Sequence, residues 1–293
     1  MRHRRLGDRT VSAIGLGAMP MTKPGRDEAG GIATIHAALD VGITFIDTAD
    51  AYHSVPGAAG LNELLIAAAL RSYEGDTSQL VIATKGGSLN PGIPGADWAH
   101  CGRADYLKWA AHASARRLGV ETIALYQHHR PDPRVDYEES IEALCELLDE
   151  GLISMAGISN ASTAQISLAH GILGDALVSV QNRFSPTVRE SEPQLRLCAE
   201  LGIAFLPWSP LGGIGNADDL GGAGGRFADV ARAHGVSPQQ VCLAWELALA
   251  PTVIPIPGAS RPASMLDSVG AVDLQLDDNE IAELSAAVAD HGE

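Results

Sequence analysis

The stretch ITFIDTADAYHS, residues 43–54, contains the unit from which the fold is expected to be built. Ile43–Ile46 has the length and the apolar, β-branched character of a buried strand. The chain then passes directly into side chains that can carry or move a proton, namely Asp47, Asp50, Tyr52 and His53. A buried strand that ends in such groups predicts a site at the strand's carboxyl end.

Seven more apolar segments of this kind are found at Val11–Leu16, Leu80–Thr84, Ile123–Gln127, Ile153–Ile158, Leu177–Gln181, Ile203–Leu206 and Thr252–Ile256. Helical patterns separate them; Asp27, for example, can cap a helix that Gly42 ends. Strand-then-helix units of roughly 30 residues predict parallel strands joined by crossover helices. Eight units favour a closed (β/α)₈ TIM barrel over an open doubly wound sheet. We expect a single domain over residues 1–293, with an N-terminal strand or hairpin and a C-terminal helix.

Composition narrows the function classes. The formal net charge of -16, from 36 acidic and 20 basic residues, argues against a nucleic-acid partner. No apolar segment follows the basic start Met1–Arg5, so we expect no signal peptide. No window approaches the ~18 apolar residues of a membrane helix. The four cysteines are far apart and without a CxxC pair, which favours reduced thiols in a cytoplasmic protein.

Polar residues follow nearly every predicted strand. In a barrel of this kind the active site lies on the loops after the carboxyl ends of the strands. Each position alone has a simpler explanation as a helix cap, a turn residue or a solvated charge. Together they predict one site, built from Asp47, Lys85, His128, His129, Ser159, Asn160, Gln181, Trp208, Ser209 and Gly258.

These segments also carry a family resemblance. GLGAM, FIDTADAY, VIATKGG, LYQHHRPDP, GISN, VQNRFSP, PWSPLGG and IPIPGAS resemble, in order and spacing, the motifs of the aldo-keto reductases. The resemblance spans nearly the whole chain and implies an NADPH-dependent oxidoreductase that reduces aldehydes or ketones reversibly. It assigns the catalytic tetrad to Asp47, Tyr52, Lys85 and His129. Asp50 and His53 fall outside the motif, and we interpret them as surface or substrate-loop residues. His128 stands where the family usually has an apolar residue.

The tetrad is also reasonable as chemistry. Reduction of a carbonyl needs a hydride at carbon and a proton at oxygen, and a tyrosine with its ordinary pKa of about 10 is a weak acid for this task. A neighbouring Lys85 cation would lower the pKa of Tyr52, and Asp47 would fix and compensate that cation. His129 can hydrogen-bond and orient the carbonyl oxygen.

The expected cofactor is NADPH, with NADH as a weaker alternative. GLGAM lacks the third glycine of GxGxxG and opens no helix, so a Rossmann site is rejected. The resemblance implies hydrogen bonds from Ser159, Asn160 and Gln181 to the nicotinamide carboxamide, and stacking of Trp208 on its ring. The other expected cofactor contacts are Gly17, Ala18, Met19 and Asp47, then Ser209, Leu211 and Gly213 around the pyrophosphate, and Gly258, Ser260, Arg261, Ser264, Asp267 and Ser268 at the adenosine end.

The adenosine end departs from the family's pattern. Relatives commonly carry a larger polar residue at Ser264 and a Glu-Asn pair at Asp267 and Ser268, so the strength of the preference for NADPH is open. Arg261 is the only basic residue in the segment after the last strand. It is either the group that binds the 2′-phosphate or a solvated surface side chain.

Two other classes compete with the reductase. The chain could be a nucleotide-binding regulatory or channel-associated subunit of the same fold, although an intact tetrad weighs against this. A metal-dependent hydrolase is disfavoured, because only His128 and His129 are clustered and no HxH pair occurs. The physiological substrate is not readable from the sequence. A monomer is the default expectation, and the glycine-rich run 211–225 is the candidate for a lid.

Overall fold

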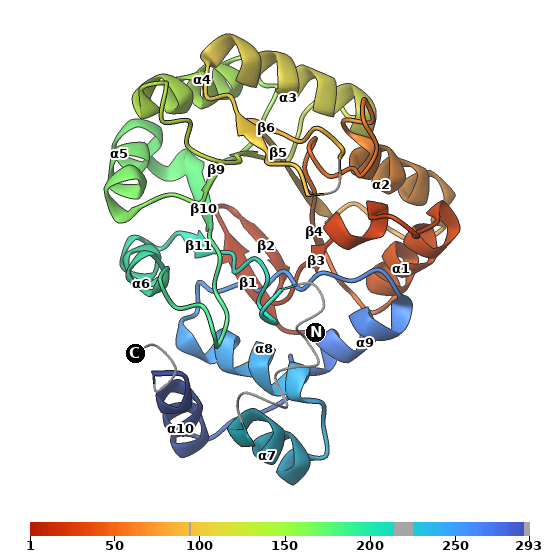
Figure 1. The fold of residues 1–293 in the computed structure, drawn as a ribbon, viewed down its shortest axis with the longest axis vertical. Coiled ribbons are helices and arrows are strands. Elements are labelled where there is room, and N and C mark those ends of the chain that lie inside the picture. The colour runs from red at the N-terminus through yellow and green to blue at the C-terminus, as the bar shows by residue number, and fades with distance from the viewer. Residues whose placement is uncertain (94, 214–224, 290–293) are drawn as a thin grey trace.

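The computed structural model describes residues 1–93, 95–213 and 225–289 of the 293-residue chain. Within these residues, parallel strands form a sheet that curls around a central axis, with helices outside it (Figure 1). The strands follow one another in chain order around the sheet: β3 (Leu16–Gly17), β4 (Phe45–Asp47), β5 (Val81–Gly86), β8 (Leu125–His128), β9 (Ala156–Ser159), β10 (Leu177–Gln181) and β11 (Ala204–Phe205). This is the predicted TIM barrel.

The eighth position of the barrel is filled by the segment 253–258, which is not a regular strand. It bridges β11 through Phe205 and Val253, and it bridges β3 through Gly17 and Gly258, so the barrel is closed. Two prolines explain the irregularity, because proline has no N–H to donate to a ladder. The carbonyls of Pro255 and Pro257 still accept from Gly15 and Gly17, at 2.9 and 3.0 Å.

Helices surround the barrel and alternate with the strands, as predicted. The ring is formed by α1 (Glu28–Asp40), α2 (Leu61–Ser72), α3 (Ala104–Leu118), α4 (Tyr137–Asp149), α5 (Thr163–Leu173), α6 (Glu192–Leu201), α8 (Pro238–Leu249) and α9 (Pro262–Gly270). α7 (Gly225–His234) and the C-terminal α10 (Asp278–Ala289) lie outside this ring (Figure 1). The predicted cap of α1 is confirmed, since the Asp27 carboxylate accepts from the Gly30 N–H at 2.6 Å.

The prediction of a single strand over Val11–Leu16 was wrong, because this segment is divided between two sheets. β2 (Arg9–Ser12) pairs antiparallel with β1 (His3–Leu6), and only β3 belongs to the barrel. The chain changes direction where the Ser12 hydroxyl donates to the Ile14 carbonyl at 2.7 Å. The β1–β2 hairpin lies across the amino-terminal end of the barrel, and its Leu6 is fully buried there. An N-terminal hairpin is therefore confirmed.

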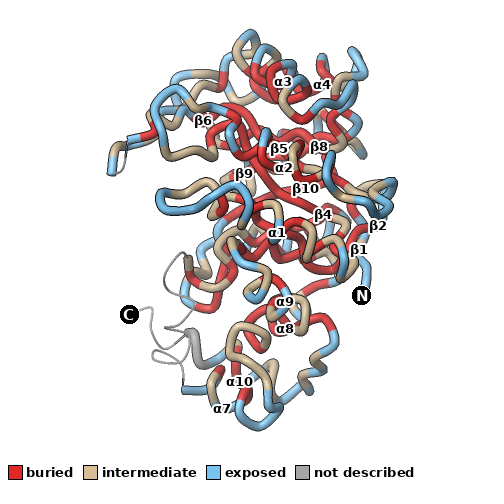
Figure 2. The backbone as a smooth tube through the Cα atoms, turned by 90° about the vertical axis from the view of Figure 1, so that its right-hand side faces the viewer, coloured by how far each residue is buried: buried red, intermediate tan, exposed pale blue. Residues whose placement is uncertain are grey.

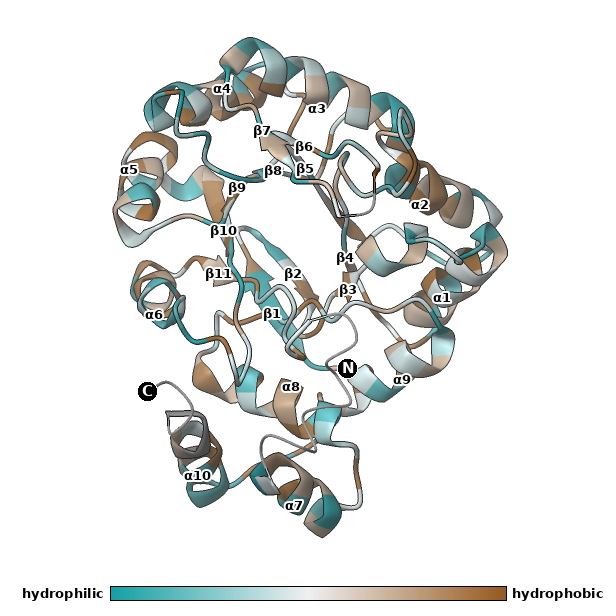
Figure 3. Ribbon diagram, in the orientation of Figure 1, coloured by the Kyte–Doolittle hydropathy of each residue, from teal (hydrophilic) through white to brown (hydrophobic). Residues whose placement is uncertain are grey.

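The apolar core has an inner and an outer part. Phe45, Val81, Leu125 and Ile254 belong to a cluster inside the barrel. Larger clusters lie between the sheet and the helices, and the buried backbone forms a continuous layer through the molecule (Figure 2). The outer helices alternate between polar and apolar stretches, as expected when one face covers a sheet and the other meets water (Figure 3). The core thus fixes the strands, and their carboxyl ends remain available for a site.

Two expectations concern particular segments. Among the described residues, none of the helices has the length and apolarity needed to cross a membrane. Residues 214–224 of the glycine-rich run lie outside the described residues, so its proposed role as a lid stays a prediction.

Glu246 is an exception to the apolar packing of α8. Its side chain is fully buried, and neither carboxyl oxygen has a hydrogen-bond partner among the described residues. Burial raises the pKa of this carboxyl well above its ordinary value, although the Arg189 charge opposes the shift. A carboxyl whose pKa is higher in the folded than in the unfolded state does not oppose folding at low pH, where it is protonated in both states. As the pH rises above its unfolded-state pKa of about 4.3, the unfolded chain ionises more readily, and the native state is progressively destabilised.

We therefore predict that Glu246→Gln stabilises the protein at pH 8 and has a smaller effect at pH 4.5. The expected gain in melting temperature at pH 8 is about 2 °C or more, equivalent to roughly 1 kcal/mol for a chain of this size. Glu142→Gln, at an exposed position of α4, is the control and should change little at either pH. A Glu246→Gln variant that is less stable at pH 8 would mean that the carboxylate has a partner in solution.

Candidate active site

The four predicted catalytic side chains converge at the carboxyl end of the barrel. The Lys85 ammonium donates to Asp47 Oδ2 at 2.7 Å, to the Tyr52 hydroxyl at 3.0 Å and to the Thr48 carbonyl at 2.8 Å. These three bonds use all the protons of the ammonium. His129 lies beside Tyr52, with the two ring centroids 5.7 Å apart in an edge arrangement. Tyr52 therefore has both a cation and an imidazole as neighbours.

Hydrogen bonds connect the segment that carries Tyr52 to β5 and to the loop that follows β5. The Thr48 N–H donates to the Ala83 carbonyl of β5 at 2.8 Å, and the Asp50 N–H donates to the Lys85 carbonyl at 3.2 Å. The Asn90 amide adds bonds to the Ala51 and His53 carbonyls, at 2.8 and 2.7 Å. Backbone pairing with β5 and the bonds from the Asn90 side chain explain how a loop residue reaches a buried lysine with a defined geometry.

Asp47 is held from three directions. Besides Lys85, Gln181 of β10 donates to Asp47 Oδ1 at 2.7 Å, and Gln127 of β8 donates to the same oxygen at 3.3 Å. Burial is the largest single influence on the pKa of Lys85 and lowers it, but the charge of Asp47, the neighbouring Tyr52 and the hydrogen bonds to both together outweigh it, and the net shift is upward. Lys85 therefore stays a cation although it is fully buried.

The pKa of Tyr52 is raised, not lowered. Burial is the largest influence and raises it, while the Lys85 cation lowers it, as expected from the sequence, but by less. Tyr52 is thus protonated at neutral pH and can act as a proton donor. Burial and the charges of Lys85 and Arg130 hold the pKa of His129 well below its ordinary value. A neutral imidazole beside Tyr52 can donate a hydrogen bond without competing for the proton.

The two adjacent histidines point in different directions, as consecutive residues at the end of a strand do. His128 is buried against Tyr137 at the start of α4, with ring centroids 5.7 Å apart, while His129 faces Tyr52. Burial lowers the pKa of His128 to about 4, so it is neutral at physiological pH. The structure thus places His129, and not His128, with the tetrad.

The position of Asp50 differs from its interpretation as a surface residue. It is not a surface residue: only 6% of it is exposed, because its backbone pairs with β5 and carries the side chain inward. Burial and the nearby Glu63 charge raise the pKa of Asp50 to about 8. Glu63 itself accepts from Thr84 of β5 at 2.6 Å and from Arg117 of α3 at 2.5 Å. His53, by contrast, lines the cavity beside Tyr52, in line with a substrate-loop position.

The residues expected at the nicotinamide form one network next to the tetrad. The Ser159 hydroxyl donates to the Gln181 carbonyl at 2.6 Å. The Asn160 amide donates to Ser159 Oγ and to the His129 carbonyl, and it accepts from the Trp208 indole N–H at 3.1 Å. Among the described non-glycine residues, only Asn160 and Ser209 have a positive φ, of 56° and 55°. Backbone strain of this kind is concentrated at functional sites.

The remaining expected cofactor contacts extend from this network. Gly17 is the last residue of β3, Ala18 and Met19 follow it, and the Ala18 N–H donates to the Asp47 carbonyl at 2.9 Å. A Cβ on Gly17 would lie 2.8 Å from the Ile256 carbonyl oxygen, so the close approach of the two strands requires glycine. Leu211 and Gly213 follow Trp208 and Ser209 at the border of the described residues, where Gly213 has a φ of 116°.

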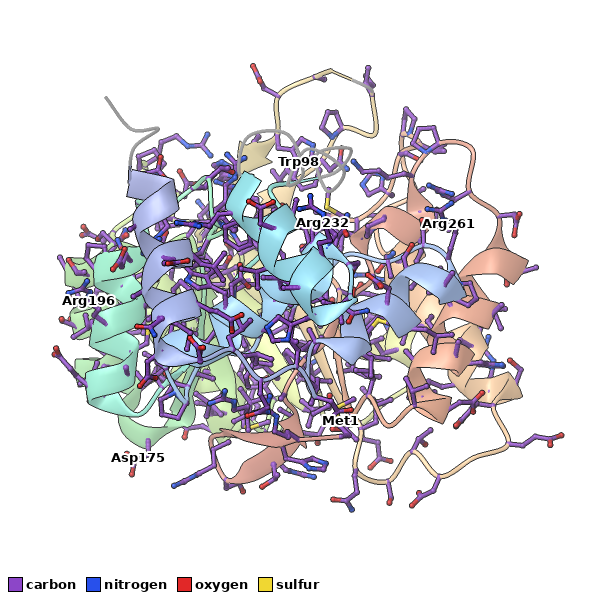
Figure 4. All side chains as sticks on the ribbon, turned by 90° about the horizontal axis from the view of Figure 1, so that it is seen from below. Met1, Trp98, Asp175, Arg196, Arg232 and Arg261 are labelled. Atoms are coloured by element: carbon purple, nitrogen blue, oxygen red, sulfur yellow. The ribbon has the colours of Figure 1, made fainter. Side chains whose placement is uncertain are left out.

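At the expected adenosine end, Gly258 and Ser260 lead into α9, and Arg261 is its N-cap residue. The Arg261 side chain is exposed and bonds to none of the described residues. In Figure 4, Arg261 and Trp98 lie toward one end of the molecule, and Met1 and Asp175 toward the other. Ser264 is half-buried in the first turn of the helix.

Two other predicted contacts at this end already have partners in the protein. Asp267 accepts from Ser237 and from Gln240 of α8, both at 2.8 Å. Ser268 is buried and donates to the Ser264 carbonyl at 3.0 Å. Both therefore have a structural role, and their contact with a cofactor stays a prediction.

A cavity of about 350 Å³ opens beside Tyr52. Its walls come from the loop after β3, the loop after β4 and the long loop after β5, which includes β6 (Ser88–Leu89) and β7 (Ala99–His100). Trp98 of that loop has its ring 6.4 Å from His129 in an edge arrangement, so it lines the cavity. In the part of the chain that is described, His, Cys, Asp and Glu residues form no cluster of three or more suited to a metal.

Sequence reasoning missed several residues that build the site. Gln127 could have been found from its spacing, because it precedes His129 by two residues and therefore faces the same side of the strand. Asn90 gave no signal, since its partners are backbone carbonyls 37 and 39 residues earlier in the chain. The pair of buried Glu63 and half-buried Arg117 joins two helices and is visible only in three dimensions.

Known proteins resemble this chain along nearly its whole length. It matches the Aldo/keto reductase family over residues 13–289. An uncharacterized oxidoreductase of Schizosaccharomyces pombe is 35% identical over 96% of this chain and 88% of its own length. A 6-dehydroglucose reductase of Novosphingobium aromaticivorans is 33% identical over 90% of this chain and 88% of its own.

One solved structure adds a ligand to the comparison. An aldo/keto reductase from Klebsiella pneumoniae, in complex with NADP and acetate, superimposes with a TM-score of 0.80 at 26% identity, covering 97% of this chain and 94% of that one. The barrel, its site and these relatives identify the class of protein as an oxidoreductase. The chain belongs to the aldo/keto reductase family.

Proposed function

We propose that this protein is an NADPH-dependent reductase of aldehydes or ketones, which also catalyses the reverse oxidation of an alcohol. The observation that supports this best is the position of Tyr52, whose hydroxyl lies 3.0 Å from the buried Lys85 ammonium at the barrel mouth. Family membership and the reductase name of a relative point in the same direction. The four cysteines are unpaired, which supports a reducing compartment such as the cytoplasm.

Each of the four tetrad residues has its own role in the proposed reaction. Tyr52 gives its proton to the carbonyl oxygen, and Lys85 stabilises the phenolate that remains. His129, held neutral by burial and by nearby cations, donates a hydrogen bond that orients the same oxygen. Asp47 balances the Lys85 charge and keeps the ammonium in place. When bound, NADPH supplies the hydride to the carbonyl carbon.

The proposed cofactor site fits a nicotinamide on chemical grounds. Ser159, Asn160 and Gln181 offer hydroxyl and amide groups, which match the donor and acceptor of a carboxamide. Trp208 offers a flat aromatic face beside them. The complex of the Klebsiella relative with NADP supports the choice of coenzyme. NADH would be a weaker alternative.

The first test removes the proton donor. Tyr52→Phe should lower the turnover of a simple aldehyde such as 4-nitrobenzaldehyde by roughly 10²–10⁴-fold, the range for loss of a general acid. Binding of NADPH, followed by fluorescence, should be nearly unchanged, which separates loss of chemistry from loss of folding. A variant that keeps more than a tenth of the wild-type turnover would refute the assignment of Tyr52.

The second test compares the two members of the buried ion pair. Lys85→Met should lower turnover by about 10²-fold or more, because Tyr52 loses the cation that stabilises its phenolate. Asp47→Asn should be less severe, since the asparagine keeps the shape and the ammonium remains. Lys108→Met removes a more exposed lysine of α3 and is the control for loss of a positive charge. Full activity in Lys85→Met would contradict the proposed mechanism.

The third test concerns the coenzyme's 2′-phosphate, which a chain with a net charge of -16 repels overall. Arg261 is exposed at the N-terminus of α9 and free to bind this group. Arg261→Ala should weaken NADPH binding by roughly 1.5–3 kcal/mol, the range for a hydrogen bond to a charged group, and leave NADH binding nearly unchanged. Arg196→Ala, another exposed arginine, is the control. Equal losses for both coenzymes, or none, would show that Arg261 does not bind the phosphate.

A further inference from the structure

The cavity beside Tyr52 differs in charge from the rest of the protein. The chain has 36 acidic residues, yet no carboxylate is among the described residues that line this cavity. Its volume of about 350 Å³ is at the small end of ligand sites, which suits a compact substrate. The polar groups that remain free in its walls should therefore decide which small carbonyl compounds bind.

Most of the polar side chains in the walls are already bonded to the backbone. The Thr22 hydroxyl donates to the Tyr52 carbonyl at 2.9 Å, and the Ser54 hydroxyl donates to the Thr22 carbonyl at 2.8 Å. Asn90 uses its amide nitrogen on two carbonyls and accepts from the Gly92 N–H at 2.8 Å. These three residues hold the loops together, so they are poor candidates for substrate recognition.

The neutral ring of His53 offers the cavity a hydrogen-bond acceptor, its Nε2 atom. Its Nδ1 lies 2.8 Å from the Val55 carbonyl oxygen, which can only accept, so Nδ1 carries the hydrogen. The neutral ring then presents the lone pair of Nε2. This atom can accept from a substrate hydroxyl, but it repels an anion.

Lys23 carries a positive charge, unlike the other described side chains that line the cavity. It follows the 3₁₀ turn Met19–Thr22, is half-exposed and lines the cavity, and its ammonium bonds to no described residue. The other lysine of the site, Lys85, is neutralised by Asp47. Arg130 adds positive charge near the tetrad, because it contributes to the lowered pKa of His129 and opposes the rise in the pKa of Tyr52. Among the described residues that line this cavity, an anion would meet the Lys23 ammonium and no carboxylate.

We propose that the preferred substrates are small aldehydes or ketones that carry an anionic group, a carboxylate or a phosphate monoester, and that Lys23 binds this group. The proposal rests on the reductase function argued above. A lysine ammonium is a flexible point charge that suits either group. Because the whole molecule repels anions, a local cation at the cavity is the feature that makes their binding favourable.

The test compares matched substrates that differ only in charge. The pairs are 4-carboxybenzaldehyde with benzaldehyde, and glyceraldehyde 3-phosphate with glyceraldehyde. In the wild type, kcat/KM should be about tenfold or more higher for the anionic member of at least one pair, equivalent to a single charged hydrogen bond. The pair that shows the preference identifies carboxylate or phosphate as the group that is recognised.

Lys23→Met should remove most of this preference by raising KM for the anionic member, with less than a twofold change for the neutral one. Lys23→Glu should reverse the preference. Arg26→Met removes an exposed charge three residues further along, outside the cavity lining, and is the matched control. The affinity for NADPH should be unchanged in all three variants.

Two kinds of failure can be told apart. Turnover of both members of each pair with equal kcat/KM would overturn the role of Lys23 while leaving the reductase function intact. A fall in NADPH affinity in Lys23→Met would also overturn it, because Lys23 would then belong to the cofactor site. No turnover of any of the four compounds would instead refute the reductase function itself.

Discussion

The arrangement of this site depends on one buried ion pair, between the Lys85 ammonium and the Asp47 carboxylate, 2.7 Å apart. Taking a lysine and an aspartate out of water costs several kcal/mol for each charge, and only good geometry with further hydrogen bonds compensates for it. The structure provides those bonds from Tyr52, the Thr48 carbonyl and Gln181. Removal of either partner would leave an isolated charge in the interior. The pair therefore constrains the barrel mouth, and the position of Tyr52 follows from it.

The barrel makes such a pair possible because it brings distant segments to one end. Gln181 reaches Asp47 across 134 residues of sequence, and Lys85 reaches it across 38. Each side chain is fixed by a strand end or by backbone pairing next to one, so little conformational entropy remains to be lost on binding. The distribution of charge also differs between the whole protein and its barrel mouth. Its net charge of -16 repels anions overall, whereas isolated cations such as Arg261 and Lys23 stand where anionic groups of a coenzyme or substrate could bind.

Much of this could be predicted from the sequence, because apolar runs at regular spacing and polar residues at their ends are local signals. The barrel and a single site at its mouth follow from them, whereas the tetrad was assigned from the resemblance to the aldo-keto reductases. The failures arose where tertiary contacts override local pattern. Val11–Leu16 looks like one strand, yet the hairpin takes its first half. Asp50 looks like a surface carboxylate, but pairing of its backbone with β5 turns it inward. Asn90 was missed because it recognises only backbone carbonyls, which no side-chain pattern reveals.

We propose that the ordered site at the barrel mouth directs a hydride from NADPH to a carbonyl carbon. It is tested most directly with NADPH that carries deuterium at both hydrogens of nicotinamide C4. The purified protein should convert an aldehyde into an alcohol that contains one deuterium on the former carbonyl carbon, as measured by mass spectrometry and NMR. The hydroxyl proton should come from solvent. An alcohol without deuterium, or no conversion by a protein that binds NADPH, would show that this site does not transfer the hydride.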